Sequence, residues 1–177
     1  MRIYFTLLFC VLYYFANTQT DHYLYEAQKF SPPEKAQIAQ FEGFPVTPIQ
    51  ASDIDGVKHN VQSQSGSYQL LWFWNYSSHL NTDLISEMNE LHSDKTLSIL
   101  CFADEQKAEM VRLQSELNIE FPVIPNSSML GEAVYASELG YPRAFLVDPS
   151  GIIRRVFPSS LLSGSEQVKD IILGSIQ

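Results

Sequence analysis

An unbroken apolar run at residues 70–74 constrains the fold of this chain more than any other feature. The run Leu-Leu-Trp-Phe-Trp stops at Asn75, where mostly polar residues begin. A continuous apolar run bounded by turn residues is typical of a strand that is covered on both faces. Apolar residues then recur at helical spacing, which predicts a helix from about Asn81 to His92. The sequence therefore predicts a buried strand that leads through a polar turn into a helix.

A second strand and helix follow in the same order. Residues 96–103 are predicted to form a strand that is apolar on both faces, and Asp104 is predicted to cap a helix that ends near Asn118. Right-handed crossovers of this kind build a parallel sheet with helices on both faces. The pattern therefore indicates an α/β domain.

The C-terminal part is predicted to add a hairpin and a closing helix. Two prolines interrupt residues 119–125, which places that segment at a sheet edge or in a connection, and a short helix is predicted over 128–137. Strands on either side of the turn Pro-Ser-Gly at 149–151 predict an antiparallel hairpin. Ser165 can cap the last helix.

The N-terminal residues resemble a secretory signal peptide. Arg2 is followed by an uncharged stretch whose most apolar part runs from Ile3 to Ala16. A bilayer-spanning helix needs roughly 20 apolar residues, so an uncleaved anchor is the less favoured alternative. We therefore expect residues 1–20 to be a signal peptide, and the mature protein to be exported to the periplasm or another extracytoplasmic compartment.

The rest of the chain is predicted to form one domain. The length of 177 residues and the hydrophobic content of 45% suit a single globular domain. It is expected to begin near Phe41 and to occupy residues 41–177, with a leading hairpin that turns at Asp55-Gly56. Residues 21–40 contain Ser-Pro-Pro at 31–33, so a linker and a short helix both remain open.

Charge and composition exclude several classes of function. The chain has 11 Lys and Arg against 20 Asp and Glu, a net charge of -9, which disfavours nucleic acid and anionic membranes as partners. The four histidines lack the spacing of metal ligands, and no cofactor is expected. The two cysteines are Cys10 and Cys101, and signal-peptide cleavage would remove Cys10, leaving no pair for an intramolecular disulfide.

Several short motifs stand in a fixed order along the chain: Asp55-Gly56, Phe73-Trp74, Phe121-Pro122-Val123, Gly140-Tyr141-Pro142, Phe145-Leu146-Val147-Asp148 and Gly151. Together with the order of the predicted elements, they resemble the thioredoxin-like superfamily, in particular the exported TlpA/ResA-like thiol-disulfide oxidoreductases of the redoxin type. The resemblance covers about residues 41–177. It implies a thioredoxin-like α/β fold, a mixed central sheet flanked by helices, with an extra N-terminal hairpin.

The resemblance also implies a redox site, and both cysteines of that site are missing. In this family Phe-Trp is followed, after three residues, by Cys-x-x-Cys, and the two positions here hold Ser78 and Asn81. Dithiol exchange needs a thiolate and a second thiol that resolves the mixed disulfide. The hydroxyl of Ser78 cannot form a disulfide, and the amide of Asn81 cannot resolve one. A role in cell redox homeostasis is therefore implied only by the resemblance.

Two catalytic alternatives depend on other residues. Cys101 stands inside a predicted buried strand, where free cysteine behaves as a small hydrophobic residue; a redoxin-type activity through Cys101, or another activity in the same cleft, stays the alternative. A serine hydrolase needs a base within reach of Ser78, but His79 is its chain neighbour, and neighbours on a helix point apart. We therefore expect Ser78 to cap the helix and His79 to be solvated.

The two tryptophans of the central strand are expected to be mainly structural. We place Trp72 and Trp74 on opposite sides of the strand, with one or both in the core. Trp74 is the one expected to reach the site at the end of the strand.

A binding role is the function predicted for the degenerate site, and the chain is not expected to be an enzyme. The resemblance implies a cis peptide bond before Pro142, beside the redox turn. The backbone of Tyr141 would then be exposed and could pair with an extended segment of a protein or peptide partner. The expected binding residues are Trp74, Ser78, His79, Tyr141 and Pro142.

Overall fold

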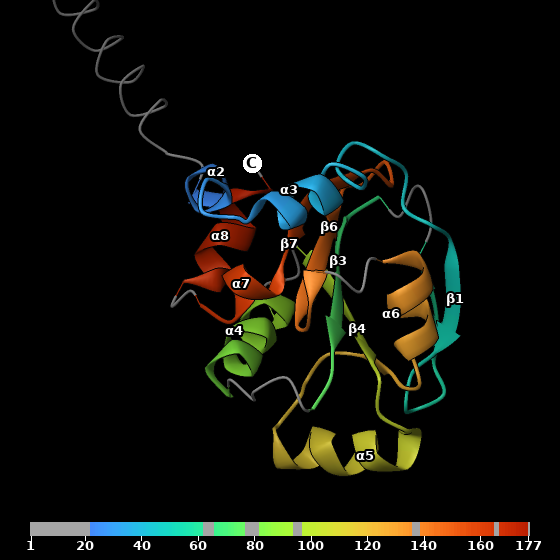
Figure 1. Cartoon of the computed structure of the whole chain (residues 1–177). Helices are drawn as coiled ribbons and strands as arrows, with labels where there is room; N and C mark the ends of the chain where they lie inside the picture. Colours follow the sequence, from blue (N-terminus) through green and yellow to red (C-terminus); the bar gives the residue numbers. More distant parts are fainter. Residues whose placement is uncertain are drawn as a thin grey trace, which may run out of the picture.

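The computed structural model describes residues 22–61, 66–76, 82–93, 97–135, 139–164 and 167–176. A five-stranded sheet in the order β5-β4-β3-β6-β7 forms its centre (Figure 1). Its parallel strands are β3 (Tyr68–Trp74), β4 (Leu97–Ala103) and β5 (Val123–Ile124). β6 (Arg143–Val147) pairs antiparallel with β3, and β7 (Ile153–Phe157) pairs antiparallel with β6. The predicted mixed sheet, with the 119–125 segment at one edge, is confirmed.

Helices and a small hairpin cover this sheet. The helices α4 (Thr82–Ser93), α7 (Ser159–Leu162) and α8 (Val168–Gly174) lie on one side (Figure 1). The other side carries α6 (Ser128–Val134) and the antiparallel hairpin of β1 (Ile49–Ser52) and β2 (Lys58–Val61). The helix α5 (Lys107–Glu116) crosses the end at which the parallel strands finish. The α/β fold with an extra N-terminal hairpin is confirmed.

The unbroken apolar run of β3 follows from its central position. Every residue from Leu70 to Trp74 is buried, because β4 and β6 flank the strand and helices cover both of its faces. The rings of Trp72 and Trp74 lie on the same face, with centroids 6.4 Å apart. The expectation that they lie on opposite sides is wrong, because residues two apart in a strand share a face.

The segment before Phe41 is part of the packed structure. It forms α2 (His22–Ala27) and α3 (Pro32–Ile38), so the helical alternative for this segment applies. Tyr23 is buried, and its hydroxyl bonds to the Val156 carbonyl of β7 (3.0 Å) and to Glu42 Oε1 (2.6 Å). These contacts satisfy polar groups at the edge of the sheet.

Of the two predicted helix caps, Asp104 is wrong and Ser165 lies outside the described residues. The N-cap of α5 is Gln106 rather than Asp104, and the Asp104 carboxylate instead accepts a hydrogen bond from Tyr141. Ser165, like the predicted signal peptide at 1–20, lies outside the described residues. Within the described part, no helix has both the length and the apolar character needed to cross a bilayer.

Candidate functional site

The three parallel strands end together, and hydrogen bonds tie the residues that follow them into one surface. The N–H of Asp104 donates to the carbonyl of Trp74 (3.2 Å), and the N–H of Asn126 donates to the carbonyl of Glu105 (2.9 Å). We call this end of the sheet the carboxyl edge; it comprises residues 74–76, 104–106, 125–129 and 141–143. Ligand sites of open α/β sheets lie at this end of the strands.

The described part of the predicted binding site comes together at the carboxyl edge. Phe73 of β3 pairs with Arg143 of the antiparallel strand β6. Trp74, which follows Phe73, therefore lies near Pro142, which precedes Arg143. The Tyr141–Pro142 peptide bond is cis, as the resemblance implies. Ser78, Asn81 and His79 lie outside the described residues.

The burial of these residues limits what they can offer a ligand. Trp74 is 3% exposed and Pro142 is buried, whereas Tyr141 is half-buried. The backbone of Tyr141 was expected to pair with a bound chain, and its carbonyl already accepts a hydrogen bond from Ser159 Oγ (2.7 Å). The hydroxyl of Tyr141 is also engaged within the fold, because it donates to Asp104 Oδ1 (3.2 Å).

A buried arginine, which the sequence analysis did not single out, organises the surroundings of Tyr141. The Arg143 side chain is 0% exposed and donates to the carbonyls of Tyr135 (2.8 Å), Gly140 (2.8 Å) and Gly131 (2.7 Å). Its guanidinium also lies 4.3 Å from the centroid of the Tyr141 ring. A cation suits this place because α6 directs its unpaired C-terminal carbonyls there. The signal in the sequence that could have identified Arg143 is a charged residue at the start of an otherwise apolar strand.

Two half-buried carboxylates follow β4 at the same edge. Burial raises the pKa of Asp104 above its ordinary value, although hydrogen bonds from Tyr141 and Asn75 oppose the shift. Burial also raises the pKa of Glu105, whose Oε1 accepts the N–H of Tyr76. These side chains were missed as well, and their position directly after a parallel strand was the available indication.

The only cysteine in the described part, Cys101, is not placed to react as a thiolate. Cys101 lies within β4 and is 1% exposed, which confirms the prediction of a core residue. Burial raises the pKa of its thiol far above the ordinary value, with smaller contributions from the charges of Glu105 and Asp104. Because the thiolate is the reactive form, this sulfur is a poor nucleophile where it lies.

Gly131 offers a direct test of how tightly this arrangement is packed. A Cβ atom at Gly131 would lie 2.7 Å from Tyr141 Oη and 3.0 Å from Arg143 Nη2. Glycine to alanine usually stabilises a helix interior by ~0.5–1 kcal/mol. We expect Gly131→Ala to reverse that sign and lower the free energy of unfolding by about 1–3 kcal/mol, as overpacking does, in urea titration.

The matched control is Gly174→Ala at the end of α8, where an added Cβ would meet nothing within 4 Å. This variant is expected to be as stable as the parent, or more stable by up to ~1 kcal/mol. Equal effects of the two substitutions would contradict the close packing of Gly131 against Tyr141 and Arg143.

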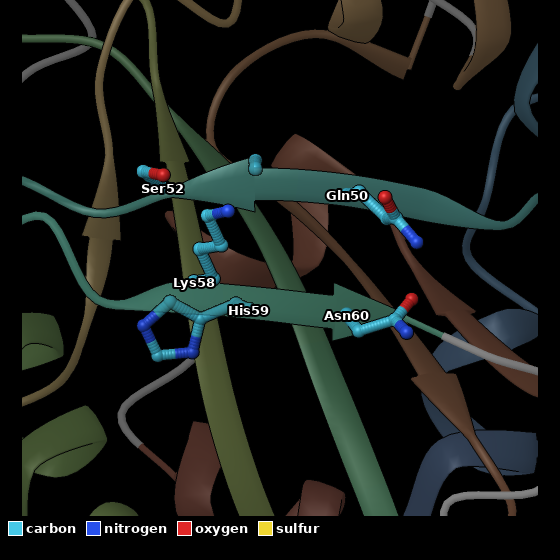
Figure 2. A pocket seen from close by; sticks show the side chains of 6 residues that line it. Gln50, Ser52, Lys58, His59 and Asn60 are labelled. Atoms are coloured by element: carbon cyan, nitrogen blue, oxygen red, sulfur yellow. The ribbon is translucent and has the colours of Figure 1, made fainter.

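A separate hollow lies over the β1–β2 hairpin, with a volume of about 410 Å³ (Figure 2). Its exposed polar side chains come from two cross-strand pairs, Gln50 with Asn60 and Ser52 with Lys58. His59 is held by Asp53, with 2.6 Å between Nε2 and Oδ2. Across the described residues, no group of three or more His, Cys, Asp or Glu side chains could hold a metal ion.

Strand order, the cis proline at the start of β6 and the helices on both sides define a thioredoxin-like fold. No family model matches the chain, and no curated protein matches it. Solved structures of thioredoxin-family thiol-disulfide oxidoreductases and of peroxiredoxin-like proteins do match. The resemblance to redoxin-type thioredoxin-like proteins is therefore confirmed for the fold.

Three of these structures illustrate the likeness. A thiol:disulfide interchange protein of the thioredoxin family from Chlorobium tepidum is 15% identical, with a TM-score of 0.57 over 77% of this chain and 98% of that one. The pneumococcal exposed lipoprotein thioredoxin from Streptococcus pneumoniae is 17% identical, with a TM-score of 0.58 over 73% and 98%. A peroxiredoxin-like protein from Aquifex aeolicus is 12% identical, with a TM-score of 0.60 over 76% and 85%.

Proposed function

We propose that this protein is an exported, redox-inactive binding module built on a thioredoxin-like fold. The observation that carries the proposal is the placement of sulfur. The sequence has cysteine only at positions 10 and 101, and Cys101 is enclosed in β4. Disulfide exchange needs an accessible thiolate and, in a dithiol enzyme, a second thiol to resolve the mixed disulfide. With Ser78 and Asn81 at the positions that the resemblance assigns to cysteines, the turn has neither.

The proposed binding surface is the carboxyl edge, where Tyr141 remains partly accessible. Tyr76 is 40% exposed and lies beside the half-buried Glu105. An aromatic ring next to hydrogen-bonding groups suits recognition of a polypeptide. Ser78 and His79 belong to this proposed surface by their place in the sequence.

Export is the proposed location, because the stretch after Arg2 has the composition of a signal peptide. A structurally similar protein is described as an exposed lipoprotein, which agrees with a thioredoxin-like fold at work outside the cytoplasm. The net charge of -9 makes nucleic acid and anionic lipid poor partners.

The competing function is a redoxin activity through Cys101 and a thiol of a partner. It would require the Cys101 side chain to leave a site that is 1% exposed and its thiol to ionise against a raised pKa. Both requirements oppose attack on a disulfide or a peroxide.

Reduction of insulin by dithiothreitol tests the proposal. The protein is expected to give no turnover above background, because it lacks an accessible thiolate. The double variant Ser78→Cys, Asn81→Cys is expected to form a reducible disulfide and to accelerate the reaction, since the helix end after β3 favours a thiolate. Turnover of the parent that disappears in Cys101→Ala would overturn the proposal and establish the alternative.

Thiol labelling supplies the control for these rates. In a Cys10→Ser background, Cys101 is expected to react with an aromatic disulfide reagent only after unfolding. Fast labelling of the folded protein would contradict its enclosure in β4. A double variant that forms no disulfide would show that Ser78 and Asn81 are not the two redox positions.

A further inference from the structure

The carboxyl edge combines exposed apolar side chains with an excess of negative charge. Met129, in the first turn of α6, is 81% exposed, and Tyr76 is 40% exposed. Glu105 accepts the N–H of Tyr76, and Glu132 follows Met129 on α6. Together with Asp104 and Glu109, these residues form a group of six that we call the acidic patch; its carboxylates are Asp104, Glu105, Glu109 and Glu132.

The carboxylates of the acidic patch act on one another. The charge of Glu132 acts on Asp104, and the charges of Asp104 and Glu109 act on Glu105. Glu105 Oε2 is shielded from water and accepts no hydrogen bond from any residue that the structure describes. A shielded carboxylate oxygen without a donor is costly, and a cation of a partner molecule would act on Glu105 through its charge rather than by contact with this oxygen.

Nearby cations only partly offset this charge. Arg112 on α5 is paired with Glu116 and also lies 3.9 Å from Glu109 Oε1. The guanidinium of Arg143 is bonded to backbone carbonyls, and its charge acts on Asp104 and Glu132. Lys107, the first residue of α5, is exposed and reduces the net charge of the region. The excess of acidic side chains remains, in agreement with the net charge of -9 for the whole chain.

We infer that the acidic patch binds a basic segment of a partner polypeptide, in which lysine or arginine side chains alternate with apolar ones. This inference rests on the proposed binding function and names the chemistry of its partner. Basic side chains would pair with the carboxylates, while apolar side chains would cover Tyr76 and Met129. Such an arrangement attracts basic partners and repels acidic ones, so that charge determines specificity.

Fluorescence anisotropy of the full chain with labelled probe peptides tests the inference. The first probe alternates lysine with leucine, and its analogues carry glutamine or glutamate in place of lysine. The lysine peptide is expected to bind about tenfold or more tightly than the glutamate peptide, and this preference is expected to shrink as salt rises. Equal affinity for the three peptides, or no binding of the lysine peptide, would overturn the inference.

Variants then locate the binding surface. Glu105→Gln and Glu132→Gln each remove one charge, and Glu132 is exposed, so at least that substitution leaves packing intact. Each substitution is expected to weaken binding of the lysine peptide by about two- to tenfold. The control Asp170→Asn removes a charge from the exposed side of α8 and is expected to change affinity by less than about twofold. Equal effects of Asp170→Asn and Glu132→Gln would overturn the placement of the site.

The proposed function and this inference can fail separately. Insulin turnover through Cys101 would remove the proposed function whatever the peptides do. Binding of all three peptides with equal affinity, together with absent turnover, would leave a redox-inactive binding module whose partner is not selected by charge.

Discussion

Replacement of Arg143 by leucine is expected to lower the free energy of unfolding by about 3–5 kcal/mol. The guanidinium donates to the carbonyls of Tyr135, Gly140 and Gly131; the bonds to Tyr135 and Gly131 are buried and the bond to Gly140 is partly buried. Leucine restores some apolar volume but supplies no donor. The three carbonyls belong to the backbone and stay in place in the variant. They would therefore lack a hydrogen-bond donor at the end of α6 and in the segment before β6.

Denaturant unfolding followed by circular dichroism measures this effect. Arg143→Lys is expected to be intermediate, because a single ammonium cannot reach three carbonyls in the geometry of a planar guanidinium. The control Arg112→Leu removes an arginine that is half-exposed on α5 and is expected to change stability by about 0.5 kcal/mol or less. A loss below about 1 kcal/mol in Arg143→Leu would show that its hydrogen bonds are not needed for stability.

The second large effect is expected at Asp148, in the turn between β6 and β7. Its Oδ1 accepts the N–H and Oγ–H of Ser150 (2.8 and 2.6 Å) and the N–H of Ile152 (3.0 Å). Its Oδ2 accepts from Arg154 Nε at 2.6 Å. We expect Asp148→Ala to destabilise the fold by about 2–4 kcal/mol, because the turn loses all four bonds. Asp148→Asn, which keeps an acceptor for the backbone, is expected to lose less.

The stability contributed by Asp148 is expected to depend on pH. Although burial alone would raise it, hydrogen bonds from Ser150, Ile152 and Arg154 hold the pKa of Asp148 below its ordinary value. A carboxyl with a lowered folded-state pKa stabilises the fold above its unfolded pKa of about 3.9, and this contribution is lost as pH falls through the folded pKa. The difference in unfolding free energy between parent and Asp148→Asn should therefore shrink below about pH 4.

A control substitution and a second acid-sensitive carboxylate limit this prediction. Asp170→Ala on the exposed side of α8 is expected to change stability by less than about 1 kcal/mol at every pH. Asp53 also has a lowered pKa: its burial opposes the shift, while hydrogen bonds from His59 and from the backbone N–H groups of Val57 and Asp55 produce it. Some acid sensitivity should therefore persist in Asp148→Asn. A difference from the parent that stays constant with pH would contradict the role of the Asp148 charge.

Local patterns predicted most of the secondary structure because they carry their own physical cause. The apolar run of β3 requires cover on both faces, and the turn at Asp55-Gly56 places Gly56 at a φ of 85°, which suits glycine. The segment before Phe41 was harder, because α2 and α3 are short. Packing against β7 and α8 stabilises α2, whereas α3 begins with a capping box formed by Ser31 and Glu34.

The candidate site was predicted in part. The motif Gly140-Tyr141-Pro142 and the end of β3 do meet, as the family resemblance implied. The environment of Tyr141 was not predictable, because Ser159 and Asp104 reach it from elements distant in the chain. Arg143 and Glu105 were overlooked, and Asp104 was assigned only as a helix cap, for the same reason: a charged residue shows its role only once its partners are known.

The sequence by itself determined that no pair of cysteines is available for exchange at the turn, because covalent chemistry depends on which atoms are present. It also determined the order of strands and helices, through patterns that act over a few residues. Only the tertiary structure decided that Cys101 is enclosed, that Arg143 is bound to backbone carbonyls, and that the carbonyl of Tyr141 is already occupied. Burial and hydrogen bonding between distant segments depend on how the elements pack, and no local pattern contains that information.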